Sequence, residues 1–251
     1  MTLPPPPWVV AHRGASGERL ENTVDACLLA VAQGAPALEV DVQLTADGEL
    51  VVFHDWDLAR LGAGAHPAGD HRVVERLTAA ELRATPLALV PPAGGVPLRG
   101  VVPTLAELLA ALPAGFPVDL ELKRRQADRD TFAAAFANAV AARPNTLASS
   151  FDWELLAALR ERAPALPLAP LESRRGDALL AVGEDLGAWS VHAHRRLATP
   201  RLIAAAAAAG RPLLVYTVND VADARQLFAL GVAGVFTDWP ARLLRELAAA
   251  C

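Results

Sequence analysis

The stretch LEVDVQLTADGELVVFHD, from Leu38 to Asp55, indicates two short buried strands joined by a turn at TADG. Its apolar residues alternate or run together, which is typical of strands covered by other parts of a protein. Glu39 and Asp41 nevertheless interrupt the first strand, and His54 ends the second. Since side chains two residues apart share one face of a strand, both acids point to the same side. Buried acids placed together are stable only when they are protonated or paired with a cation.

The same alternation of short apolar strands and helices extends over the whole chain. WVVAH (Trp8–His12) precedes the opening stretch, and strands such as PVDLELK (Pro117–Lys123) follow it. With the split strand around TADG counted as the second, the 251 residues hold eight strand–helix units. This pattern predicts an α/β fold, a closed (β/α)8 TIM barrel, with an open doubly wound sheet as the alternative. The chain has no GxGxxG or GxxxxGKS/T motif, so nothing indicates nucleotide binding.

The alternation breaks between about residues 56 and 103. This segment is rich in Gly, Pro and Ala, and it contains one predicted helix, TAAELRA, at Thr78–Ala84. No linker sets it apart as an independent unit. We therefore interpret residues 1–251 as a single domain, a barrel with a small insertion after its second strand.

Composition and charge limit the class of protein. The formal net charge is −5 with no basic block, so nucleic acid is not expected as a partner. The most apolar tract, LIAAAAAAG (Leu202–Gly210), is far shorter than the ~20 residues that cross a bilayer, and the N-terminus has no signal-peptide pattern. Cys27 and Cys251 form no CxxC or Cys/His cluster, which argues against a zinc site or a disulfide framework. We expect a cytoplasmic enzyme without stable membrane association.

Several polar residues stand near the ends of predicted strands, where TIM barrels carry their active sites. They are His12 and Arg13 after the first strand, Glu39, Asp41 and His54 in the opening stretch, and Asp119, Glu121 and Lys123 on PVDLELK. An isolated pair of strand acids, or a lone histidine, is more often a structural feature. The joint occurrence of these residues on separate segments of one rim favours a functional site.

The chemistry of this set indicates a metal ion and a phosphate. Glu39, Asp41 and Glu121 would repel one another, and a hard cation such as Mg²⁺ or Ca²⁺ would answer that repulsion. Arg13 and Lys123 beside such an ion describe a phosphate site. Two histidines without nearby cysteines or an HExxH motif indicate acid–base chemistry rather than zinc binding.

Four further histidines are less informative. His66 and His71 lie in the insertion and are expected at the surface. His192 and His194 come at the end of the sixth strand, where they could contact a substrate. A structural role is the more frequent outcome for a lone histidine at such a position.

Ordered motifs along the chain resemble those of the glycerophosphodiester phosphodiesterases. They are HRGASGERLENT, LEVDVQLTADGELVVFHD, VPTLAELL, LELK, SSFD, VYTVND and GVFTDWP, and together they cover nearly the whole chain. The VYTVN and LASSF segments are most similar to the cytosolic bacterial type. Such an ordered set is far more specific than any single motif.

The resemblance implies a (β/α)8 barrel with a small insertion and a metal-dependent hydrolase. Its reaction would cleave glycerophosphodiesters to sn-glycerol 3-phosphate and an alcohol. By motif position, the resemblance implies that His12 and His54 are the acid–base pair and that Glu39, Asp41 and Glu121 are the ligands of Mg²⁺ or Ca²⁺. It implies that Arg13 and Lys123 contact the phosphate. It gives Glu21 and Asn22 a supporting polar role. Two positions depart from the family's pattern: Leu20 stands where proline is common, and Tyr216 where many members have tryptophan.

Two other functions stay open at the level of sequence. One is a lysophospholipase D-like or cyclising phosphodiesterase on the same barrel, although no membrane-docking segment supports it. The other is a non-catalytic barrel that binds a phosphorylated metabolite, against which the presence of both histidines argues. The sequence leaves open the head group, the ion, which histidine is the acid, the oligomeric state, and whether water or the glycerol 2-hydroxyl attacks.

Overall fold

The computed structural model describes residues 3–62, 70–90 and 95–249, so His66 and Cys251 lie outside the described residues. Eight parallel strands form a barrel: β1 (Trp8–His12), β2 (Ala37–Leu44), β6 (Val118–Leu122), β7 (Thr146–Ser150), β8 (Leu168–Glu172), β9 (Val191–His194), β10 (Leu213–Tyr216) and β11 (Gly234–Thr237). β1 pairs in parallel with both β2 and β11, which closes the ring. The predicted TIM barrel is confirmed, and an open sheet is excluded.

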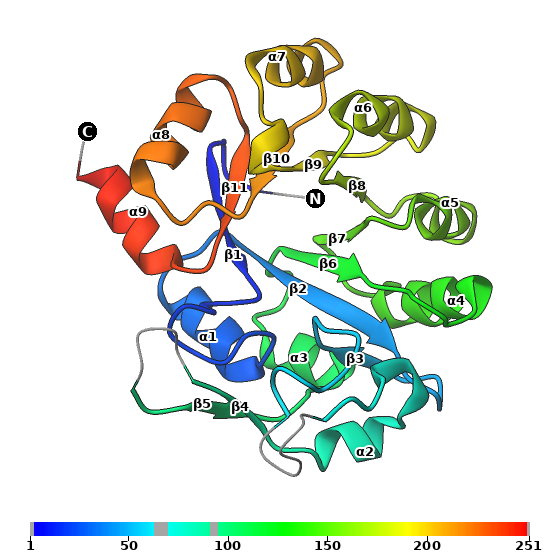
Figure 1. Cartoon of the computed structure of the whole chain (residues 1–251). Coiled ribbons are helices and arrows are strands. Elements are labelled where there is room, and N and C mark those ends of the chain that lie inside the picture. The colour runs from blue at the N-terminus through cyan, green and yellow to red at the C-terminus, as the bar shows by residue number, and fades with distance from the viewer. Residues whose placement is uncertain (1–2, 63–69, 91–94, 250–251) are drawn as a thin grey trace.

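Helices surround the strands on the outside of the barrel (Figure 1). They are α1 (Val24–Ala32), α3 (Leu105–Ala111), α4 (Arg129–Val140), α5 (Trp153–Arg162), α6 (Gly176–Asp185), α7 (Pro200–Ala208), α8 (Val221–Ala229) and α9 (Pro240–Ala248). At the start of α3, the Glu107 N–H donates to the Thr104 hydroxyl at 3.1 Å and the Thr104 N–H donates to the Glu107 carboxylate at 3.0 Å. This is a capping box, which local sequence specifies without tertiary contacts. Within the described residues, no helix is long and apolar enough to span a membrane.

β2 and its return strand position much of the polar rim. After the TADG turn, β3 (Leu50–Val52) runs back antiparallel to β2. The Phe53 N–H donates to the Asp41 carbonyl at 2.9 Å, and the Gln43 side chain donates to the Phe53 carbonyl at 2.8 Å. These bonds hold His54, the next residue, close to Asp41 of β2.

The strands of the barrel are covered on both faces. On β2, Val40 and Val42 belong to an apolar core that includes Leu108 of α3 and Phe136 of α4. The alternate residues carry the charges, and every residue of β2 is buried. A strand buried on both faces normally has a continuous apolar sequence, so the acids of β2 mark an unusual barrel interior.

The segment predicted as an insertion packs beside β3 (Figure 1). It holds η1 (Val74–Arg76), α2 (Ala79–Arg83) and the antiparallel pair β4 (Leu87–Leu89) and β5 (Leu98–Gly100). α2 lies within the helix predicted at 78–84, whereas β4 and β5 were not predicted because three residues are too few for a periodic pattern. Leu20 is buried in the same apolar cluster as this segment and β3. Leu20, one of the two residues that depart from the family's pattern, therefore packs with the insertion.

Gly14, in the loop between β1 and α1, is expected to accept no side chain. Its φ is 79°, and an added Cβ would lie 2.6 Å from the backbone carbonyl carbon of Ala26 in α1. Gly34 has a φ of 83° but nothing within 4 Å of an added Cβ. Gly34→Ala should lower the free energy of unfolding by about 1–2 kcal/mol through left-handed strain, and Gly14→Ala by about 1–3 kcal/mol more. Urea denaturation measures both losses, and equal losses would contradict the close approach.

Candidate active site

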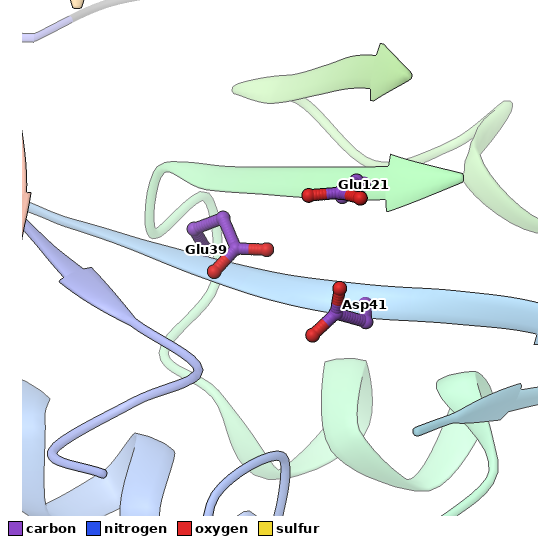
Figure 2. Close-up of side chains that lie close together, drawn as sticks. All are labelled: Glu39, Asp41 and Glu121. Atoms are coloured by element: carbon purple, nitrogen blue, oxygen red, sulfur yellow. The ribbon is translucent and has the colours of Figure 1, made fainter. Parts of the chain in front are cut away.

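Three carboxylates from two neighbouring strands lie together inside the barrel. Glu39 and Asp41 project from β2 and Glu121 from β6, and the strand register places Asp41 opposite Glu121. One oxygen of each carboxylate lies within 4.8 Å of the others, and Figure 2 shows the three groups gathered over β2 and β6. The set that the sequence predicted as metal ligands is thus brought together.

Strong repulsion would act within this cluster. Burial and the neighbouring acids raise the pKa of Glu39 well above its usual value, and burial together with Asp41 raises the pKa of Glu121. Glu39 Oε1 and Asp41 Oδ1 are buried, and no residue in the described part of the chain forms a hydrogen bond with either oxygen. Oxygens bound to one Ca²⁺ at about 2.3–2.6 Å lie at most about 5 Å apart, so the spacing suits a shared cation. The three residues could hold a metal ion, and oxygen donors suit a hard one.

Two cationic side chains lie against the cluster. Arg13 Nε is 3.2 Å from Asp41 Oδ2, and Lys123 Nζ is 3.6 Å from Asp41 Oδ1 and 3.5 Å from Glu121 Oε1. Burial alone would raise the pKa of Asp41, but the charges of Arg13 and Lys123 outweigh it and hold that pKa well below its usual value. Lys123 Nζ also lies 5.4 Å from the centre of the Trp56 ring, a cation–π contact.

The loop after β1 is held in an unusual backbone conformation. Arg13 and Asn22 have φ values of 57° and 59°, in the left-handed region that non-glycine residues seldom adopt. The Arg13 N–H donates to Glu39 Oε2 at 3.0 Å. The Asn22 amide donates to Asp41 Oδ2 at 2.8 Å, and its oxygen accepts from the Asp41 N–H at 3.1 Å. These contacts offset the backbone strain, and residues with such strain gather at functional sites.

His12 is fixed by a carboxylate from the other end of the chain. Its Nδ1 lies 2.7 Å from Asp238 Oδ1. Ser16 and Asn219 donate to the two oxygens of Asp238 at 3.1 and 2.6 Å. Burial would raise the pKa of Asp238, but the bonds from His12 and Asn219 hold it at about 2. Because an ionised carboxylate only accepts, it favours a proton on Nδ1 and leaves Nε2 of His12 for other chemistry.

His54 is fixed in a similar way, with a link to the insertion. Its Nδ1 lies 2.6 Å from Asp55 Oδ1. Arg60 donates to Asp55 Oδ2 at 2.6 Å and to both oxygens of Glu21 at 2.7 Å. Glu21 in turn accepts from Arg13 at 2.8 Å. One arginine therefore bridges the carboxylate that holds His54 and the carboxylate that holds Arg13.

A cavity of about 180 Å³ lies where these groups meet. Six of the predicted site residues line it: His12, Arg13, Glu39, His54, Glu121 and Lys123. Phe151, Tyr216 and Phe236 form an apolar wall, and the Tyr216 hydroxyl donates to the Glu172 carbonyl at 2.9 Å. Asp41, Glu21 and Asn22 lie behind this lining and contact it through the bonds described above.

The remaining histidines fall into three environments. His192 is fully buried in β9 and lines the cavity, and burial lowers its pKa to about 3, so the ring is neutral. His194, the last residue of β9, is only partly buried and does not line this cavity. His71 is exposed, as predicted.

Sequence reasoning missed the three residues that position the predicted ones. Asp55 follows His54 directly, and Asp238 follows the last strand within the GVFTDWP motif. Both positions are sequence signals that could have identified these carboxylates as histidine partners. Arg60 lies in the insertion and had no signal, because only the folded chain places it between Asp55 and Glu21.

Comparisons with known proteins identify the family of this chain. A family model described as "Glycerophosphoryl diester phosphodiesterase family" matches residues 12–242. A glycerophosphodiester phosphodiesterase of Bacillus subtilis is 30% identical over 251 residues, which cover 92% of this chain and 83% of that protein. The solved structure of an Oleispira antarctica phosphodiesterase with the product sn-glycerol-3-phosphate has a TM-score of 0.83 at 28% identity, covering 96% of this chain and 97% of that one. A lysophospholipase D of Mus musculus is 58% identical over 52 residues, which are 21% of this chain and 16% of that protein.

Mg²⁺ or Ca²⁺ should stabilise the protein through the three carboxylates. An ion present at 100 times its Kd adds about 2.7 kcal/mol to the free energy of unfolding. Glu39→Gln should lose most of that gain. In chelator the variant should be at least as stable as the parent, because the substitution relieves repulsion between buried charges.

Thermal unfolding in chelator and with each ion measures this response. Glu184→Gln, on the exposed surface of α6, is the matched control and should respond to the ion like the parent. An undiminished ion response in Glu39→Gln would remove Glu39 from the ligand set.

Proposed function

The chain belongs to the glycerophosphoryl diester phosphodiesterase family, and from this premise we propose a metal-dependent hydrolysis of glycerophosphodiesters to sn-glycerol 3-phosphate and an alcohol. The protein is a phosphodiesterase of that family; the metal dependence and the use of two histidines are the proposed part. One observation carries the proposal: two carboxylate-fixed histidines, an acidic cluster and two cations meet at a single cavity.

Glu39, Asp41 and Glu121 would hold a divalent ion, either Mg²⁺ or Ca²⁺. When bound, such an ion supplies Lewis-acid polarisation and neutralises charge on phosphoryl oxygens. Arg13 and Lys123 line the cavity beside these acids and bind the remaining phosphate charge. The guanidinium of Arg13 can contact two oxygens at once, whereas Lys123 acts as a compact point charge.

His12 and His54 carry the protons. Because Nδ1 of each ring is bonded to a carboxylate, Nε2 is the atom that exchanges a proton in the cavity. One ring takes the proton from the attacking hydroxyl, which forms the new P–O bond. The other ring gives a proton to the leaving oxygen as the old P–O bond breaks. The attacking group is water, or it is the substrate's own glycerol 2-hydroxyl. In the second case the cyclic phosphate that forms is opened by water in a second step, which gives sn-glycerol 3-phosphate.

A lysophospholipase D-like or cyclising reaction is the second candidate. The mouse lysophospholipase D is 58% identical over 52 residues of this chain. Phe151, on the cavity wall, is 47% exposed and offers an apolar surface to an acyl chain. A cyclic phosphate product, or a preference for a long acyl chain, would favour this reaction. A cytoplasmic location, the absence of nucleic-acid and membrane partners, and the single-domain organisation stay predictions.

Purified protein should release glycerol 3-phosphate from glycerophosphocholine with Mg²⁺ or Ca²⁺, and chelator should stop the release. His12→Ala and His54→Ala should each lower kcat by about 10²–10⁴-fold, because each removes one proton-transfer group. An enzyme-coupled assay for glycerol 3-phosphate gives the rates.

The control for these variants is His71→Ala, since that ring is exposed in the insertion. Full activity of both catalytic variants would overturn the acid–base assignment. Unchanged release in chelator would overturn the metal requirement, and turnover of lysophospholipids alone would favour the second candidate.

Arg60→Ala should lower kcat by about 10–10²-fold, the usual effect of losing a residue that orients catalytic groups. Arg60 is not among the residues that line the cavity, and it holds Asp55 and Glu21. Arg60→Lys should recover part of the rate, because one ammonium can contact one carboxylate well but not both. Arg72→Ala, which removes an exposed pairing with Asp70, is the control. A change in stability or KM with kcat intact would contradict this role.

A further inference from the structure

Three further buried polar side chains line the cavity beside the predicted site residues. They are Asp119 of β6, Ser149 of β7 and His192 of β9, which we call the cavity floor. Their exposed fractions are 3%, 0% and 0%. Asp119 precedes Glu121 by two residues on β6, so it lies one step further from the C-terminal rim on the same face.

The cavity floor has unused hydrogen-bonding capacity. Both carboxylate oxygens of Asp119, Ser149 Oγ and His192 Nδ1 are buried without a hydrogen-bond partner among the described residues. His192 Nδ1 lies 3.4 Å from Asp119 Oδ2, and His192 Nε2 lies 2.9 Å from Ser190 Oγ. An unpaired buried polar atom is destabilising, and native proteins leave few of them. A cluster of four such atoms on one cavity indicates a place where a ligand completes the bonding.

The chemistry of the cavity floor selects the ligand. The Asp119 carboxyl offers two buried acceptor oxygens, and Ser149 and a neutral His192 can each donate and accept. A phosphate oxygen is an acceptor with negative charge, and it offers no proton to the acceptor oxygens of Asp119. A hydroxyl group both donates and accepts, and it carries no charge to desolvate. The cavity floor therefore suits the hydroxyls of a polyol.

We propose that the cavity floor binds the hydroxyl groups of the substrate's glycerol unit, with Asp119 as the discriminating acceptor. This assignment rests on the proposed hydrolysis of glycerophosphodiesters. The phosphate then lies against Arg13 and Lys123. The alcohol that leaves points toward the partly exposed Phe151. The cavity therefore recognises the substrate mainly through its buried glycerol end. It discriminates only weakly among choline, ethanolamine and other head groups.

The test removes one hydroxyl from the substrate. The two substrates are glycerophosphocholine and its analogue with 1,2-propanediol in place of glycerol, which lacks only the terminal hydroxyl. The analogue keeps the hydroxyl next to the ester, so attack by that group stays available. Choline release reports both reactions. A buried acceptor that loses its hydrogen-bond partner lowers affinity by about 10–10²-fold, so the parent protein should prefer glycerophosphocholine by that factor in kcat/KM.

The test also removes partners from the protein. Asp119→Leu removes both acceptor oxygens and keeps a side chain that branches at Cγ, and Ser149→Ala removes one hydroxyl. In Asp119→Leu the preference should fall below about threefold, and in Ser149→Ala it should fall part of the way. Ser150→Ala is the matched control, because the adjacent side chain faces away from the cavity and donates to the Leu122 carbonyl at 2.6 Å. It should keep the preference of the parent.

Binding provides a readout that does not depend on turnover. Each protein is titrated calorimetrically with sn-glycerol 3-phosphate and with 1,2-propanediol 1-phosphate, with Mg²⁺ and with Ca²⁺. Tighter binding of glycerol 3-phosphate by the parent, lost in Asp119→Leu, supports the assignment even if no diester is hydrolysed; only the proposed hydrolysis would then fail. Equal affinity of the parent for both ligands, or a preference that survives in both Asp119→Leu and Ser149→Ala, overturns it.

Discussion

The repulsion among Glu39, Asp41 and Glu121 is the constraint on which the rest of the site depends. Acids packed into a barrel interior raise one another's pKa unless cations compensate them. Arg13 and Lys123 supply part of that compensation, and Asp41, between them, stays ionised. The left-handed backbone at Arg13 and Asn22 brings an N–H and an amide to the same acids. The strained backbone of this loop therefore places hydrogen-bond donors against the charges of Glu39 and Asp41.

The proton-transfer groups depend on how the barrel closes. His12 ends the first strand and Asp238 follows the last, so 226 residues separate them along the chain. The parallel pairing of β1 with β11 places the two residues side by side. His54 and Asp55 are neighbours in sequence, and the hairpin formed by β2 and β3 carries them to the rim. Two different routes therefore produce the same arrangement, an imidazole whose Nδ1 is bonded to a carboxylate.

The insertion is joined to the rim by charge as well as by apolar packing. Its hydrophobic residues form a cluster with Leu20 and with β3, so the segment is anchored beside the return strand. Arg60 extends from it to Asp55 and Glu21. This link explains how a segment outside the eight strand–helix units can influence both a histidine and a phosphate-binding arginine.

The barrel fold, the capped starts of helices and the shared face of the acids on β2 and β6 can be predicted from the amino-acid sequence. Periodicity, capping and strand alternation are local properties of the chain. The metal, phosphate and histidine assignments followed from residue type at strand ends, and the structure brings those residues to one cavity without testing their roles. Only the tertiary structure reveals four other features. They are the short strands β4 and β5, the pairing of Asp238 with His12, the bridge through Arg60, and the unpaired polar atoms of Asp119, Ser149 and His192. Each joins segments distant in sequence or too short for a periodic pattern, and no local pattern records which buried polar atom lacks a partner.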